Sequence, residues 1–307
     1  MLAIETRGLT KQYGAYRALD GVDLRVPAGS VFGFLGPNGA GKTTCIRVLL
    51  GLLRATTGEA RVLGKSVWSD GAGVRAEIGY LPGDVRFNDF WTGRETLRFL
   101  DQMRGGRSAP EIARLADRFQ LPLQKHVRSY SRGMRQKLGL IQALMHKPAV
   151  LILDEPTTAL DPLVQQTLFE ELRAVAADGR TILFSSHTLS EVDHLCEYVA
   201  ILRGGKLIEQ DRIEALRKRA VRNVELDFFD EAAATALRAP AEFHPGVRGP
   251  RSLIGSWTGS PQALLQWLAT LPLEDVRISE PSLEDLFLGY YDLRPNGKPS
   301  AGNGAAA

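Results

Sequence analysis

The chain has 307 residues, of which 44% are apolar, and its formal net charge is +3, which allows one large domain or two smaller ones with a packed core. A charge this small gives no reason to expect nucleic acid as a partner, and no apolar run reaches the roughly 20 residues that span a bilayer. Because the chain has only two cysteines and no signal-like apolar stretch near its start, we expect a cytosolic protein without disulfides.

The first strong motif along the chain is a glycine-rich loop. Residues 22–26 alternate in polarity and predict an antiparallel strand, and residues 36–44 then read GPNGAGKTT, the phosphate-binding pattern G-x-x-x-x-G-K-[ST]. A buried run precedes this loop and a helix-like segment follows it, an order that turns backbone N–H groups toward an anion. We expect Lys42 to bind the β- and γ-phosphates of a nucleotide and the Thr43 hydroxyl to ligate Mg²⁺. The other loop residues expected around the nucleotide are Asn38, Gly39, Ala40, Gly41 and Thr44.

Helical patterns dominate between residues 88 and 148, most clearly at 94–103 and 109–119. A further helix is expected after Ser131, whose side chain suits an N-cap. A helix N-terminus with a free hydroxyl and exposed N–H groups can bind an anion, and Gly133 leaves space for a close approach. We therefore expect a second contact with the phosphates of a shared nucleotide here.

Two later apolar segments end in polar residues and predict buried parallel strands, which bind ligands at their carboxyl ends. The segment 150–153 is followed by Asp154, placed to hold Mg²⁺ through its water shell, and by Glu155, which points elsewhere and can polarise an attacking water. The segment 181–186 ends at His187, which could sense or hold the γ-phosphate. Helices are expected at 162–177 and 188–197, followed by a hairpin at 199–209.

These motifs together resemble the nucleotide-binding subunit of ATP-binding-cassette (ABC) transporters over about residues 1–218. The matching segments are 36–44 for Walker A, 151–154 for Walker B, 131–134 for the signature motif and 159–161 for the D-loop. The resemblance implies that Glu155 is the catalytic glutamate, His187 the switch histidine and Tyr13 the aromatic that stacks on adenine. It also implies a homodimer of two cassettes closing head to tail around ATP, bound through a separately encoded permease to the inner face of the cell membrane.

Two positions depart from the family pattern. The signature reads YSRGM where the family has LSGGQ, but Ser131 and Gly133 keep the serine and the second glycine. Gly83 stands where the family has a glutamine that contacts Mg²⁺ and the attacking water and leads to the permease interface. A water or the carboxylate of Asp84 could replace that glutamine, and we favour the water because Mg²⁺ readily keeps several waters.

The pattern restarts after about residue 219. Strands are expected at 224–228 and 276–278, with helices at 231–237 and 261–271, the latter with Leu264, Leu265, Trp267 and Leu268 on or near one face. This predicts a small accessory α+β domain over 219–293, ferredoxin-like, with its Trp and Phe residues in the core. Residues 280–288 resemble the C-terminal segment of bacterial drug- and antibiotic-export cassette subunits, and 294–307 are predicted to be disordered.

The sequence thus predicts an α/β fold, a P-loop NTPase cassette in which a mixed sheet is joined by an antiparallel β subdomain and by a helical subdomain at about 88–148. The expected function is a Mg²⁺-dependent ATPase that powers export through a separate permease. A soluble cassette acting on DNA or ribosomes is an alternative, but the interval 45–128 is too short for the coiled coil of the DNA type, and the ribosomal type usually has two cassettes. A non-hydrolysing regulatory cassette is the other alternative: Glu155 and His187 argue against it, while Gly83 leaves it open.

Overall fold

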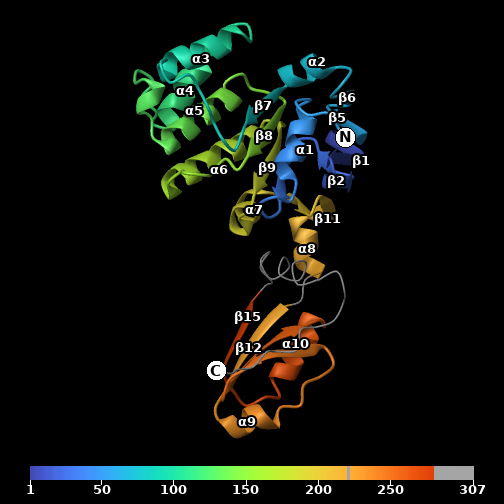
Figure 1. Ribbon diagram of the computed structural model, residues 1–307. Coiled ribbons are helices and arrows are strands. Elements are labelled where there is room, and N and C mark those ends of the chain that lie inside the picture. The colour runs from blue at the N-terminus through green and yellow to red at the C-terminus, as the bar shows by residue number, and fades with distance from the viewer. Residues whose placement is uncertain (220–221, 280–307) are drawn as a thin grey trace, which may run out of the picture. The chain divides into compact units, whose positions relative to one another are not determined.

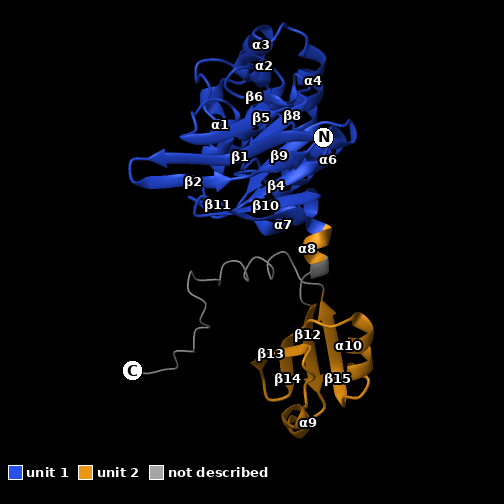
Figure 2. Ribbon diagram, turned by 90° about the vertical axis from the view of Figure 1, so that its right-hand side faces the viewer, with its two compact units in different colours: residues 1–213 blue, residues 214–307 orange. Residues whose placement is uncertain are grey.

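The computed structural model describes residues 1–219 and 222–279. The segment 280–288 and the predicted disordered tail 294–307 lie outside these residues. The chain divides into two compact units, residues 1–213 and 214–307 (Figure 2). The predicted domain limits, 1–218 and 219–293, stay predictions. Among the described residues, no helix combines the length and apolarity needed to cross a membrane.

The centre of unit 1 is a mixed sheet whose strands are ordered β11-β10-β4-β9-β8-β7. The strands from β10 to β7 are parallel, whereas β11 pairs antiparallel with β10. Every residue of β4, β8 and β9 is buried, as expected for strands covered on both faces. The hairpin predicted at 199–209 is confirmed as β10 and β11. The strands are β4 (Val31–Leu35), β7 (Ile78–Leu81), β8 (Val150–Asp154), β9 (Thr181–Ser186), β10 (Tyr198–Arg203) and β11 (Lys206–Arg212).

A second, antiparallel sheet lies beside this one, and α1 (Lys42–Leu49) is between them (Figure 1). Apolar side chains of α1 share one buried cluster with residues from both sheets, so the helix that follows the glycine-rich loop is fixed on two sides. This arrangement confirms the predicted antiparallel β subdomain. Its strands are β1 (Leu2–Tyr13), β2 (Tyr16–Val22), β3 (Arg25–Pro27), β5 (Thr57–Val62) and β6 (Lys65–Ser66).

The single strand predicted at 22–26 is wrong, because the chain bends between β2 and β3. The Thr6 hydroxyl donates to the carbonyl of Val22 at 2.7 Å and accepts from the N–H of Leu24 at 2.8 Å. This buried hydroxyl takes the place of ladder hydrogen bonds at the bend. Both flanking strands pair antiparallel with β1, so the predicted pairing direction is correct.

The helical subdomain has the helices that the sequence predicts. Thr92 and Glu95 form a capping box at the start of α3, which fixes where that helix begins. Arg114 on α4 makes a two-pronged ion pair with Glu171 on α6, which joins the helical block to the rest of unit 1. The helices are α2 (Gly71–Ala76), α3 (Gly93–Gln102), α4 (Ala109–Arg118), η1 (Val127–Ser129), α5 (Arg132–Leu144), α6 (Pro162–Ala177) and α7 (Leu189–Leu195).

Unit 2 begins in α8 (Ile213–Arg219) and contains one antiparallel sheet with strand order β13-β14-β12-β15. Its β-α-β-β-α-β element order confirms the ferredoxin-like prediction. Phe228, Phe243 and Trp257 lie in its core, as expected, but Phe229 is 62% exposed, because it directly follows the buried Phe228 and points to the other side. Leu265 is 60% exposed because it lies about a quarter-turn away from the buried Leu264. The elements are β12 (Arg222–Phe228), α9 (Glu231–Ala236), β13 (Phe243–Arg248), β14 (Ser252–Trp257), α10 (Pro261–Leu268) and β15 (Leu273–Ser279).

Candidate functional site

The glycine-rich loop joins the carboxyl end of β4 to the N-terminus of α1, and two of its glycines cannot be replaced without a clash. Gly41 has φ +111°, and a Cβ on it would lie 2.6 Å from the carbonyl oxygen of Ala18. A Cβ on Gly36 would lie 2.3 Å from the carbonyl oxygen of Leu202. Both distances are shorter than any normal contact, so the loop can follow this path only with glycine.

The Lys42 side chain is buried inside the loop. Its Nζ donates to the carbonyl oxygens of Gly36 at 2.5 Å and Pro37 at 3.3 Å. Burial lowers the pKa of Lys42, while the nearby carboxylates of Glu155 and Asp154 act in the opposite direction. The amine is therefore held by the same loop that presents its backbone to a ligand.

Asp154 is the last residue of β8, and two hydroxyls from neighbouring elements hold its carboxylate: Thr43 at the start of α1 and Ser185 near the end of β9. Thr43 Oγ1 donates to Oδ2 at 2.9 Å, and Ser185 Oγ donates to Oδ1 at 2.6 Å. Asp154 is only 3% exposed. A carboxylate and a hydroxyl oxygen side by side are hard oxygen ligands of the kind that Mg²⁺ prefers, so Thr43 and Asp154 fit the expected metal role. The sequence interpretation missed Ser185, although a serine at the end of the apolar strand beside β8 was a usable signal.

Glu155 lies between the amine of the loop and the predicted histidine. Its Oε1 is 3.9 Å from Lys42 Nζ and 3.4 Å from His187 Nδ1. The backbone of Glu155 is in the left-handed region at φ +50°, and its N–H donates to both the carbonyl and the hydroxyl of Ser185. This conformation turns Glu155 away from Asp154, as the sequence interpretation expected. The structure thus brings Lys42, Glu155 and His187 together.

A cavity of about 200 Å³ opens over the loop. Tyr13 lies at its edge, 47% exposed, with Lys11 Nζ 5.1 Å from the ring centroid. Tyr16, on the adjacent strand, also lines the cavity and was missed, because an isolated tyrosine in a strand has no signal in the sequence. The lining residues are Tyr13, Tyr16, Ala18, Pro37, Asn38, Gly39, Ala40, Gly41, Lys42, Thr43, Thr44 and Glu155, so every predicted loop residue is among them.

The predicted signature residues lie elsewhere in the chain and do not line this cavity. Ser131 caps α5 by accepting from the N–H of Met134 at 3.2 Å, which confirms the predicted N-cap. A Cβ on Gly133 would lie 2.7 Å from the carbonyl oxygen of Ala159, so the close approach expected at this glycine is made by the D-loop of the same chain.

Gly83 lies beside the carboxylate that we expect to bind metal. A Cβ on Gly83 would lie 3.8 Å from Asp154 Oδ2, an ordinary contact distance. The neighbouring Asp84 is directed to Arg86 instead, with 2.7 Å between its Oδ2 and the guanidinium. Both of these side chains are largely exposed.

Three features define a P-loop nucleoside triphosphatase. The phosphate loop follows the central parallel strand β4, a buried aspartate ends β8, which lies two strands from β4 in the sheet, and a glutamate directly follows that aspartate. The family model described as ABC transporter matches residues 19–158. The chain is 36% identical to the bacitracin transport ATP-binding protein BcrA of Bacillus licheniformis, over 76% of this chain and 78% of that protein. It is 35% identical to the daunorubicin resistance ATP-binding protein DrrA3 of Streptomyces coeruleorubidus, over 93% and 95%. The chain therefore belongs to the ABC transporter family, as an ATP-binding subunit.

Solved structures agree on the fold. A structure titled as the ATP-binding subunit of an ABC transporter superposes with a TM-score of 0.66 at 29% identity, over 71% of this chain and 92% of that one. The cassette MJ0796, in a dimeric post-hydrolysis state with ADP and Pi, superposes with a TM-score of 0.63 at 20% identity, over 68% and 98%. The predicted cassette fold is thereby confirmed, and the chain is an ABC-type ATPase.

Proposed function

We propose that this chain is the motor subunit of an exporter, which hydrolyses ATP to drive a substrate through a separate membrane permease. One observation carries the hydrolytic part: Glu155 Oε1 lies 3.9 Å from Lys42 Nζ and 3.4 Å from His187 Nδ1 at the mouth of the phosphate loop. The names of the relatives in bacitracin transport and daunorubicin resistance support export rather than import. On this proposal the chain works at the inner face of the cell membrane, held there by its permease.

Nucleotide binding is assigned to the cavity over the loop. The amides of residues 38–44 and the Lys42 amine bind the phosphates, because the N-terminus of α1 and a buried cation both favour negative charge. The ring of Tyr13 stacks on the base, and Tyr16 lies next to it. Thr43 and Asp154 hold Mg²⁺, which when bound neutralises part of the phosphate charge.

Hydrolysis is assigned to Glu155. Its carboxylate accepts the proton of the attacking water as the water oxygen bonds to the γ-phosphorus, while the bond from that phosphorus to the β–γ bridging oxygen breaks and ADP leaves with phosphate as the other product. His187 is directed at the same carboxylate and is placed to orient it and to contact the γ-phosphate. This carboxylate suits the task because it lies near the phosphate loop and does not share the hydrogen bonds that Thr43 and Ser185 make to Asp154.

A second copy of this chain completes the site. Ser131 and Gly133 do not line the cavity of their own chain, so we assign them to the ATP that a partner cassette holds. The dimeric cassette structures that share the fold support this assembly. The N-terminus of α5, with its capping serine, then faces the γ-phosphate from the other side.

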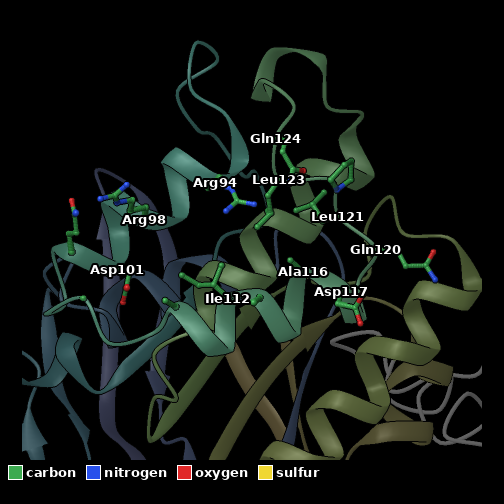
Figure 3. Close-up of a pocket in the computed structure, with 15 residues that line it drawn as sticks. Arg94, Arg98, Asp101, Ile112, Ala116, Asp117, Gln120, Leu121, Leu123 and Gln124 are labelled. Atoms are coloured by element: carbon green, nitrogen blue, oxygen red, sulfur yellow. The ribbon is translucent and has the colours of Figure 1, made fainter.

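The surface that we expect to contact the permease is a cavity of about 1100 Å³ in the helical subdomain. Figure 3 shows Arg94 on α3 next to Leu123, which lies on the segment after α4. Arg98 on α3, Ile112 on α4 and Leu121 also line the cavity. Neither arginine forms an ion pair within the part of the chain that the structure describes. Asp101 and Asp117 also line the cavity, but among the described residues neither carboxylate forms an ion pair with these arginines. An apolar wall beside two unpaired guanidinium groups fits an amphipathic helix that carries carboxylates.

The docking assignment is tested by exchanging charge. The double variant Arg94→Glu with Arg98→Glu should lose co-purification with the permease from membranes while its thermal midpoint stays unchanged. Arg25→Glu, an exposed arginine on β3, is the matched control and should keep the permease. Retention of the permease by the double variant would contradict the docking assignment.

The motor assignment is tested by Glu155→Gln. The amide keeps the size of the side chain but cannot accept the proton, so ATP binding should persist while turnover falls by about 10²-fold or more. Sedimentation of this variant should show a dimer with Mg²⁺ and ATP and a monomer with ADP. Wild-type turnover would remove Glu155 from the mechanism. A wild-type protein that binds ATP without any turnover, alone or with its permease, would favour the regulatory alternative.

A further inference from the structure

We propose that two glutamine amides, Gln136 on α5 and Gln165 on α6, are positioning residues that hold the loop 155–160 from opposite sides. The loop runs from Glu155 through the D-loop, and each amide donates to carbonyls at one of its ends. The proposal rests on the hydrolytic role of Glu155 given above. The helix α5, which begins at the predicted signature motif, would then have a second role: it would position the Glu155 carboxylate of its own chain.

The loop needs support because its backbone is strained at two places. Glu155 has φ +50° and Ala159 has φ +62°, both in the left-handed region that residues with a Cβ rarely adopt. Strained residues persist only where the surrounding structure over-determines them. The residues between β8 and α6 belong to no helix or strand, and a few backbone hydrogen bonds, such as those from Thr158 N–H to the Glu155 carbonyl and from Leu160 N–H to the Thr157 carbonyl, hold them. Side chains therefore add a substantial part of the support.

The first amide holds the beginning of the loop. Gln136 Nε2 donates to the carbonyl of Pro156 at 3.0 Å and is 3.5 Å from the carbonyl of Glu155. Gln136 is 5% exposed, and Pro156 has no N–H, so its carbonyl is the only backbone group through which a partner can hold it. Ser185 binds the N–H of Glu155, so both backbone polar groups of the catalytic glutamate are held.

The second amide holds the end of the loop. Gln165 Nε2 donates to the carbonyl of Leu160 at 3.2 Å and is 3.5 Å from that of Thr157. Gln165 sits in the first turn of α6, whose N-cap Asp161 accepts from the N–H of Val164 at 3.0 Å. The two glutamines therefore bind carbonyls on both sides of the strained residue Ala159.

The link matters because α5 belongs to two sites. Its N-cap Ser131 is assigned to the ATP of the partner cassette, and Gln136 follows five residues later, about 7.5 Å along the same rigid helix. A shift of α5 when the partner's nucleotide binds would be passed by the Gln136 amide to the backbone of Glu155. Closure at one ATP can in this way prepare the carboxylate at the other.

The test replaces each amide by a side chain of similar length that cannot donate. Gln136→Met and Gln165→Met should each lower kcat by about tenfold, because without its hydrogen bond to the loop each variant holds Glu155 less firmly in the position that hydrolysis requires. The ATP dissociation constant should change by less than about twofold. Gln166→Met is the matched control, because that exposed amide donates to the Glu170 side chain and not to the loop 155–160. It should keep the wild-type kcat.

A purely structural role would lower ATP affinity and thermal midpoint together with kcat, and that result would overturn the proposal. Wild-type kcat in both methionine variants would overturn it as well. If Gln136→Met does not fold, Gln165→Met alone decides by the same criteria. Adding Gln136→Met to Glu155→Gln should not reduce the residual single-turnover rate further, because the amide acts through Glu155. A further tenfold loss there would contradict the link.

The same set separates this proposal from the motor assignment. If Glu155→Gln is inactive while both methionine variants turn over normally, the positioning role alone fails. If Glu155→Gln turns over at the wild-type rate, the role of Glu155 fails and the positioning role fails with it.

Discussion

Replacing Asp84 by alanine tests which group takes the place of the family glutamine at Gly83. The structure favours a water, because the Asp84 carboxylate is paired with Arg86 at 2.7 Å and both side chains are exposed, 74% and 86%. The site beside Asp154 is bordered by Gly83, which offers no side chain and leaves room for a water. Mg²⁺ accepts water as a ligand more readily than most ions.

The expected effect of Asp84→Ala is small. An exposed ion pair contributes about 0–1 kcal/mol, so the free energy of unfolding should fall by less than about 1 kcal/mol. The Mg²⁺ concentration for half-maximal ATPase should change by less than about twofold. Asp154→Asn should by contrast raise it at least tenfold, about 1.4 kcal/mol, because it removes the buried negative charge that Thr43 and Ser185 hold in place.

The assay is the initial ATPase rate at fixed ATP over a series of free Mg²⁺ concentrations. Arg86→Ala is the matched control, since it breaks the same ion pair and leaves the Asp84 carboxylate free to move. A tenfold increase in the Mg²⁺ requirement of Asp84→Ala, with unchanged ATP affinity in the absence of metal, would show that Asp84 is the ligand and would refute this reasoning.

Four further predictions concern binding, stability and domain independence. Lys42→Ala should lower ATP affinity in calorimetric titration by about 100-fold, and unchanged affinity would contradict the assignment of the loop. Glu171→Gln should cost about 1–2 kcal/mol in urea unfolding, because the Arg114 guanidinium loses its nearly buried anionic partner; a loss below 0.5 kcal/mol would contradict this. Burial lowers the pKa of His146 to about 4, so the unfolded chain takes up a proton below the ordinary pKa of about 6.5 while the fold does not, and stability should fall between pH 6.5 and 4, less so in His146→Gln. A chain that ends after Ala220 should fold and keep the ATP affinity of the full chain, and loss of affinity in a folded product would contradict the independence of the second unit.

Much of the fold could be predicted because its signals are local. The strand that ends in Asp154 has four consecutive apolar residues, and the strand before His187 has three. Helix starts such as Ser131 and Thr92 are set by capping groups a few residues away. The phosphate loop was recognisable because its glycines meet steric demands that no other residue meets. Structural features that depend on residues close together in the chain can be predicted from the sequence.

Several of the residues that were missed act through contacts far along the chain. Ser185 holds Asp154 from 31 positions away, and Gln136 reaches Pro156 from 20 positions away. The strand predicted at 22–26 was wrong for the same reason, because the Thr6 hydroxyl that bends it lies 16 residues from Val22. In the sequence, Gln136 and Thr6 look like ordinary surface residues until the fold brings their partners together, whereas the place of Ser185 at the end of an apolar strand was a signal that could have been used.

The size of the nucleotide cavity argues that one chain supplies only part of the site. Its volume of about 200 Å³ is below the roughly 300–1,000 Å³ of typical ligand pockets, although ATP is a large ligand. On the proposed assembly the remaining walls come from the partner chain, whose Ser131 and Gly133 we expect to bind phosphate and which line no part of the cavity in their own chain. A second copy that brings them there would bury the γ-phosphate next to Glu155 and exclude bulk water, whereas ADP would leave the signature helix without a γ-phosphate to bind. The affinity between two copies should therefore depend on the γ-phosphate, which is the property that a motor requires in order to couple hydrolysis to separation.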